Sequence, residues 1–157
     1  MMRRATAADL PAIMAIERLK LFHVFIGQSG AEEHARWQDE DDSDELVWEV
    51  DGAVRGFAVL QKLTSPATVL LKRIAVDAPG EGLGTPFVHA VMAHVFAMPH
   101  VHRLELDTSA ENPRARHVYE KLGFVHEGRV RDVYRVDDRF VSSDLFSILR
   151  PEWEARA

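Results

Sequence analysis

Three glycines at alternating positions are the feature of this sequence that most directly suggests ligand chemistry. Gly80, Gly82 and Gly84 lie in the stretch DAPGEGLGTPFVHAV (residues 77–91), between a strand-like segment and a helix-like one. A loop without Cβ atoms can approach a ligand closely, and the free amides of a first helical turn attract anions such as phosphate. Because Pro86 has no N–H, we expect the useful donors to be the amides of residues 82–85.

Two familiar phosphate-binding loops do not fit this stretch. The ATPase loop ends in Gly-Lys-Ser/Thr, whereas Gly84 is followed by Thr85 and Pro86. The dinucleotide fingerprint needs a third glycine at the position that Thr85 occupies. Taken alone, the loop is equally consistent with an ordinary flexible turn before a helix.

Two carboxylates offer acid–base chemistry. Glu105 and Asp107 stand two residues apart in the strand-like segment RLELDTS (103–109), so their side chains share one face. Either can accept a proton, and either can instead pair with an arginine. The eight histidines show no metal-ligand spacing, and with no cysteine in the chain thiolate metal sites, disulfides and a cysteine nucleophile are excluded. No metal site is predicted.

The patterns around these residues predict one α+β domain. Amphipathic helices are predicted over residues 6–19 and, less regularly, 19–37, followed by a solvated acidic loop at 39–45. Asp51-Gly52 predicts a hairpin within 45–63, and further strands are predicted at 67–77, 101–107 and, joined at Asp137-Asp138, in 124–149. A helix with one buried stripe follows the glycines and ends before Pro99. The result is a mixed sheet with helices on its faces, not a doubly wound one.

The helix at 112–123 has signals at both ends. Asn112 is suited to the N-cap, Pro113 to the first helical position and Gly123 to the residue after the C-cap. Its apolar face is formed by Ala115, Val118, Tyr119 and Leu122.

Net charge and hydropathy limit the classes of molecule that the protein is expected to bind. The net charge of −6 argues against nucleic acid and is compatible with a cationic substrate. No stretch resembles a signal peptide or a membrane span, so we expect no membrane partner and a cytoplasmic location.

Together, the glycine loop and the 112–124 segment resemble the GNAT family of N-acetyltransferases. That family combines Arg/Gln-x-x-Gly-x-Gly/Ala after a strand with a later Asn-x-x-Ala-x-x-x-Tyr-x-x-x-Gly-Phe. The second motif is complete at Asn112, Ala115, Tyr119, Gly123 and Phe124. The first retains Gly82 and Gly84 but has Pro79 in place of Arg or Gln, and Glu81 puts an acid in the loop. The resemblance runs from Arg3 to about Leu149, which makes residues 1–157 a single domain, and the tail is similar to the branch of ribosomal-protein N-terminal and small-amine acetyltransferases.

The resemblance implies a GNAT fold, a mostly antiparallel sheet of six to seven strands with a splayed cleft that binds acetyl-CoA. It implies acetyl transfer to a primary amine by direct attack, without an acyl-enzyme. The cofactor diphosphate would lie on the amides of Gly82, Leu83, Gly84 and Thr85, and its pantetheine arm along Ile74, Ala75 and Val76.

Roles are also expected for five polar side chains. Tyr119 would protonate or hydrogen-bond the departing CoA sulfur, as a phenol can; otherwise it is an ordinary helix-face aromatic. Asp107 or Glu105, directly or through water, would accept the proton of the substrate ammonium. Asn112 and Arg116 would contact the cofactor, although the first also caps its helix and the second suits an exposed helix face.

Two other interpretations stay open: a CoA-binding regulatory module without catalysis, which Pro79 and Glu81 favour, and a structural protein with an idle glycine turn. The acceptor amine is also open, with a protein N-terminus, a polyamine, an antibiotic and an amino acid as the classes. Dimers are common in the family, so a homodimer is one expected assembly.

Overall fold

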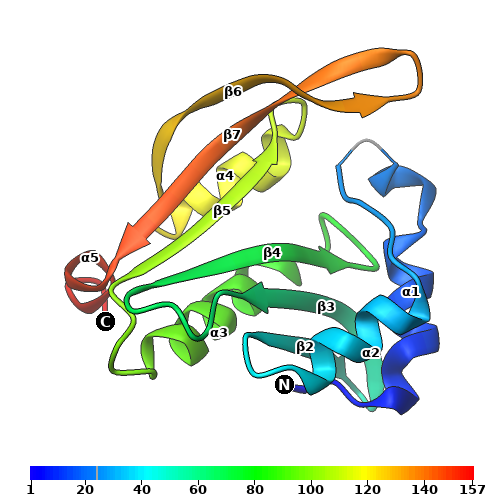
Figure 1. Ribbon diagram of the computed structural model, residues 1–157, viewed down its shortest axis with the longest axis horizontal. Helices are drawn as coiled ribbons and strands as arrows, with labels where there is room; N and C mark the ends of the chain where they lie inside the picture. The colour runs from blue at the N-terminus through cyan, green and yellow to red at the C-terminus, as the bar shows by residue number, and fades with distance from the viewer. Residues whose placement is uncertain (24) are drawn as a thin grey trace.

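The computed structural model describes residues 1–23 and 25–157 and shows one seven-stranded sheet with helices on both faces (Figure 1). The strands are β1 (Met2–Arg4), β2 (Ser43–Val50), β3 (Ala53–Gln61), β4 (Thr68–Val76), β5 (Arg103–Ser109), β6 (Val125–Val136) and β7 (Arg139–Leu149). The helices are α1 (Leu10–Glu17), α2 (Ala31–Asp39), α3 (Gly84–Phe96), α4 (Pro113–Lys121) and α5 (Arg150–Glu154), with short 3-10 turns η1 (Ala7–Asp9) and η2 (Lys20–Phe22). The predicted α+β class and mixed sheet are confirmed.

The sheet order is β1-β2-β3-β4-β5-β7-β6, and β4 and β5 are the parallel pair. These two strands are joined at only three register positions, from Thr68↔Arg103 to Leu70↔Glu105. Beyond Leu70 they diverge, as Figure 1 shows, while β4 stays paired with β3 and β5 with β7. The divergence opens the sheet in the middle and leaves one edge of β4 unpaired.

Alternation along the strands divides the core into two clusters. Leu46, Ala58 and Leu60 face α3 and α4, whereas their neighbours Val47, Phe57 and Val59 face α1 and α2. This is the period-two pattern of strands that are covered on both faces. The predicted stripe of α3 is buried from Phe87 onward, with Phe87, Val88, Val91, Val95 and Phe96 all in the first cluster, and Leu83 is partly buried against it.

The turn predictions hold in detail. Asp51 and Gly52 both have positive φ, 51° and 77°, as a two-residue hairpin of the primed type requires. At α4, the amide of Ala115 donates to Asn112 Oδ1 at 3.2 Å, and Gly123 has a φ of 95° after the last helical turn. The Asp137-Asp138 turn between β6 and β7 is also present, closed by the pair Val136↔Arg139.

Two predictions between residues 19 and 45 were wrong. Instead of one helix at 19–37 there are η2 and α2, and the first turn of α2 follows Gly30, which serves as its N-cap; Val24 lies outside the described residues. Glycine is a poor helix former, and Gly27 and Gly30 frame the non-helical stretch that precedes α2.

The acidic run is not a solvated loop throughout, because its last three residues begin β2 and are buried. Asp44 is paired with Arg4 at 2.7 Å and with His94 at 3.2 Å, and Glu45 with His34 at 2.6 Å. Burial of these carboxylates is therefore compensated by cationic or hydrogen-bonding partners from distant elements. The short helix α5 was not predicted.

Candidate active site

A cavity of about 310 Å³ lies between β4, the glycine loop and α4. Its wall is formed by β4 at Ile74, Ala75 and Val76, by the glycine loop at Pro79, Gly80, Gly82, Gly84 and Thr85, and by α4 at Asn112, Arg114, Ala115, Val118 and Tyr119. The predicted β4 segment, the glycine loop and α4 thus meet at one cavity.

The glycine loop has the backbone that its sequence requires. Gly80 and Gly82 have φ values of 93° and 84°, in the left-handed region that other residues rarely adopt. The first amide of α3 bonded to a preceding carbonyl is that of Phe87, which donates to Leu83 O at 3.3 Å. The amides of Gly84 and Thr85, in the first turn, have no carbonyl four residues back within the helix and are free to bind an anion.

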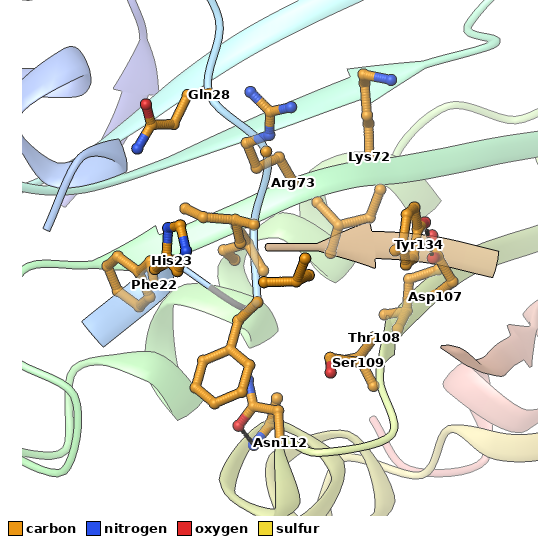
Figure 2. Close-up of a pocket in the computed structure, with 18 of the residues that line it drawn as sticks. Phe22, His23, Gln28, Lys72, Arg73, Asp107, Thr108, Ser109, Asn112 and Tyr134 are labelled. Atoms are coloured by element: carbon orange, nitrogen blue, oxygen red, sulfur yellow. Dashed lines mark hydrogen bonds between the residues drawn. The ribbon is translucent and has the colours of Figure 1, made fainter. Parts of the chain in front are cut away.

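A second cavity, of about 570 Å³, lies between β4, β5, the chain after α1 and the end of β6 (Figure 2). Its lining includes Asp107, Thr108 and Ser109 of β5, Tyr134 and Arg135 of β6, and Lys72 and Arg73 of β4. The two cavities share Phe22, Phe25, Ile74, Asn112, Ala115 and Tyr119. They therefore meet around Tyr119, where β4 and β5 have separated.

Tyr119 is almost fully buried, with 7% of its surface exposed, and borders both cavities. Its ring packs edge-on against Phe124 at 5.6 Å and also contacts Phe146. Burial, assisted by the negative charge of Asp107, raises the pKa of the hydroxyl above its usual value. The phenol therefore stays protonated at neutral pH and has a proton to donate.

Asp107 lies on the wall of the larger cavity and is fixed by two hydroxyl groups. Tyr134 Oη donates to Asp107 Oδ2 at 2.5 Å, and Ser143 Oγ donates to the same oxygen at 2.8 Å. Within the described part of the chain, Oδ1 accepts no hydrogen bond and can receive a proton from a ligand. Burial and the bond to Asp107 raise the pKa of Tyr134 to about 12, which keeps this donor protonated.

Glu105 has a different setting. Its carboxylate contacts Lys62 Nζ at 2.8 Å and Arg103 at 3.1 Å, and it is not among the residues that line the two cavities. Burial acts to raise its pKa, but the hydrogen bonds and charges of Lys62 and Arg103 outweigh burial and leave the pKa lowered. Glu105 is thus held ionised at the paired end of β5.

Asn112 lines both cavities, and its side chain also caps α4. The two expectations for this residue, a helix cap and a place at the ligand site, are therefore compatible. Arg116 lines neither: it pairs with Glu120 at 2.8 Å and lies over the ring of Phe146.

Among the described residues, no group of three or more His, Cys, Asp or Glu side chains is arranged to hold a metal ion. Nor does any described helix combine the length and apolar character needed to cross a membrane.

Residues 1–125 match the family model of the acetyltransferase (GNAT) domain. The chain belongs to the GNAT family. It is 27% identical over 84 residues to spermidine N(1)-acetyltransferase of Vibrio cholerae, covering 54% of this chain and 49% of that protein. It is 34% identical over 98 residues to a kanamycin resistance protein of Rhizobium radiobacter, covering 62% of this chain and 72% of that protein.

The GNAT fold extends over the whole chain. The crystal structure of spermidine N-acetyltransferase from Vibrio cholerae in complex with CoA and spermine matches with a TM-score of 0.86, at 19% identity, over 98% of this chain and 97% of that one. In sequence, the matched segment spans only about half the length of the curated Vibrio cholerae relative.

The two departures from the GNAT loop motif have different settings. Pro79 lines the smaller cavity, where the motif has Arg or Gln. Glu81 is 70% exposed, does not line that cavity and lies 3.8 Å from Arg55, which also binds Asp77 at 2.6 Å. The acid in the GNAT loop is therefore paired with Arg55 outside the cavity wall.

Several lining residues of this GNAT site were not predicted. Arg114 approaches the glycine loop from α4: a Cβ on Gly80 would lie 3.9 Å from its guanidinium carbon. Its position two residues after the correctly predicted cap Asn112, in the first turn of α4, was a signal that could have found it. Phe22, Phe25 and Tyr134 come from a loop and a hairpin, and no local pattern places them at the site.

Proposed function

We propose that this chain transfers the acetyl group of acetyl-CoA to a primary amine by direct attack. The observation that carries the proposal is the meeting of the two cavities at Tyr119, one lined by the glycine loop and the other by Asp107. Such an arrangement holds donor and acceptor in one ternary complex, and the chain has no cysteine to form an acyl-enzyme.

The residues of the smaller cavity fit acetyl-CoA. The amides of residues 82–85 supply donors for a diphosphate, and the unpaired edge of β4 at Ile74–Val76 supplies backbone groups for the amides of the pantetheine arm. Pro79 stands where the family motif has Arg or Gln at the start of the loop. We propose that Arg114, whose guanidinium lies close to Gly80, provides a positive charge there instead.

In the reaction, Asp107 accepts a proton from the substrate ammonium at its free Oδ1, directly or through one water, and this produces the nucleophilic amine. Asp107 is preferred to Glu105 because it lines the acceptor cavity, whereas Glu105 is occupied by Lys62 and Arg103. The amine attacks the thioester carbonyl carbon, and as the C–S bond breaks the hydroxyl of Tyr119 donates its proton to the departing sulfur. The second amine proton, released as the amide forms, returns to the Tyr119 oxygen directly or through water. Tyr119 lies where the two cavities meet, and Asp107 lines the larger cavity, in which the amine would bind.

The proposal is tested by incubating the protein with acetyl-CoA and a panel of amines and measuring the release of free CoA thiol over time. The panel contains a polyamine, an aminoglycoside, an amino acid and a peptide with a free N-terminus. Thiol release that depends on one of these amines supports the transferase.

Thermal stabilisation by acetyl-CoA with no turnover on any amine would instead support the regulatory CoA-binding module. No binding at all would support the structural interpretation. The homodimer and the cytoplasmic location stay predictions, and sedimentation and cell fractionation test them.

A further inference from the structure

Two neighbouring cations, Lys72 and Arg73, lie together on the wall of the larger cavity (Figure 2). Lys72 Nζ is 5.9 Å and the Arg73 guanidinium carbon 5.5 Å from the centre of the same Trp37 ring. Consecutive strand residues normally point to opposite faces, but the register shifts here: Val59 pairs with Arg73 and Leu60 with Leu71. Lys72 is thus the extra residue of a β-bulge, which turns both cations to one face.

Arg73 is held rigidly by buried groups. Its Nη1 donates to a carboxylate oxygen of Glu17 and, at 3.1 Å, to Ser29 Oγ. Glu17 has a fully buried side chain and also accepts from the Ser29 amide at 3.0 Å and contacts His34 Nε2 at 3.2 Å. Arg73 therefore keeps one orientation, with only 11% of its side chain exposed.

The buried network does not cancel this positive charge. His34 bridges Glu17 and Glu45, and although burial opposes its charge, the two carboxylates raise its pKa to about 9. At neutral pH the carboxylates of Glu17 and Glu45 thus face the cations His34, Arg73 and Arg18. The network has more positive than negative groups, so Lys72 and Arg73 together present positive charge to the cavity.

Apart from Asp107, the remaining charged side chain that lines the cavity is also basic. Arg135 also lines it, and in the described part of the chain neither Lys72 nor Arg135 has a carboxylate within 4.0 Å of its cationic nitrogens. Asp107 is the single acidic residue among the described lining residues, and its place is at the reacting amine. A polyamine would place its other ammonium groups near these cations at an electrostatic cost, whereas an anionic group would gain.

We propose that the acceptor is an amine that also carries an anionic group, a carboxylate or a phosphate, which binds at Lys72 and Arg73 while the amine faces Asp107. The inference rests on the proposed transferase function and specifies its substrate class.

Matched amines with and without the anionic group test this proposal. The pairs are phenylalanine and phenethylamine, lysine and cadaverine, and phosphoethanolamine and ethanolamine. For at least one pair we expect a kcat/KM about tenfold or more higher for the anionic member, the change produced by one charge-assisted hydrogen bond. Comparison of the two amino-acid pairs with the phosphoethanolamine pair shows whether the preferred anionic group is a carboxylate or a phosphate. Equal values in all pairs, or a preference for the neutral members, would overturn the inference and leave the transferase function standing.

Substitutions assign the preference to this site. Lys72→Gln should lower the anionic-to-neutral ratio of kcat/KM about tenfold, and Lys72→Arg should retain it. The two amines of a pair differ in intrinsic reactivity, but this difference is the same for every variant. It therefore cancels when the anionic-to-neutral ratio of one variant is compared with that of another. Lys121→Gln, at the exposed end of α4, is the matched control and should keep the wild-type ratio. A ratio that Lys72→Gln leaves unchanged contradicts the proposal.

Binding of the acetylated products decides the case in which no amine is turned over. Calorimetry with CoA-saturated protein compares N-acetylphenylalanine with N-acetylphenethylamine. Tighter binding of the carboxylate compound, lost in Lys72→Gln, supports the anion site even if the transferase proposal has failed. Equal binding of the two compounds overturns it.

Discussion

Tyr119→Phe is the substitution that isolates the chemical step, because it removes one oxygen and keeps the ring. The ring contacts with Phe124 and Phe146 account for the packing of this side chain, and they remain in the variant. In the described residues the hydroxyl has no hydrogen-bond partner, so its loss leaves no buried group unsatisfied. We expect the free energy of unfolding to change by less than about 1 kcal/mol.

The expected effect on catalysis is much larger. A positioned general acid typically contributes about 10²–10⁴-fold, and Tyr119 is buried at the junction of the two cavities with its proton retained. We expect kcat to fall about 10²–10³-fold, which corresponds to roughly 3–4 kcal/mol of activation free energy. Because burial raises the Tyr119 pKa, kcat of the wild type should not fall through ionisation of this group between pH 7 and 9.

The assay is thiol release at saturating acetyl-CoA and amine, with the dissociation constant of acetyl-CoA measured by calorimetry and stability by urea denaturation. The account predicts a split, with kcat strongly reduced and cofactor affinity and stability close to wild type. A fall in kcat of less than threefold would refute the acid role. So would a loss of rate matched by an equal loss of cofactor affinity.

Three other perturbations test the parts of the site and its support. Arg114→Gln should weaken acetyl-CoA binding about tenfold in calorimetry; the same change at Arg116 tests the cofactor contact expected of that residue, and an unchanged affinity would leave Arg116 its contacts with Glu120, Asp144 and the Phe146 ring. Gly82→Val should abolish detectable acetyl-CoA binding, since valine is strained at a φ of 84° and would displace the loop amides; normal binding would exclude this loop as the diphosphate site. The His34 pKa is raised to about 9 in the fold, so its contribution to stability is full below about pH 6.5 and is lost as the pH rises through 9. Urea denaturation should show a loss of up to about 3 kcal/mol over this range in the wild type and none in His34→Gln, and parallel pH profiles would contradict the charged network.

Local signals predicted the elements whose ends depend on nearby residues. The cap at Asn112, the left-handed Gly123 and the Asp51-Gly52 turn each satisfy backbone groups within a few positions, so the sequence pattern alone identifies them. The glycine loop was singled out by its spacing, whereas the role of Tyr119 was implied by the family resemblance and stays a prediction.

The error over the acidic run has its cause in long-range contacts, unlike that over 19–37, where Gly27 and Gly30 interrupt the helix locally. Asp44 and Glu45 look like surface acids until Arg4, His94 and His34, which come from other elements, are placed beside them. The bulge at Lys72 exists only relative to the register of β3, and no feature of β4 by itself reveals it.

The acceptor side of the site shares this limitation. Phe22, Tyr134 and Arg135 reach the cavity through a loop and the far end of a long hairpin. Their positions depend on tertiary packing, which explains why the lining of the smaller cavity was predicted more completely than that of the larger one.

A crystal structure of the protein with CoA tests the central claim most directly. The account predicts the diphosphate on the amides of residues 82–85, the pantetheine arm along Ile74–Val76, and the sulfur within about 3.5 Å of Tyr119 Oη, near hydrogen-bond reach. CoA bound outside the cleft between β4 and β5, or a sulfur directed away from Tyr119, would contradict it.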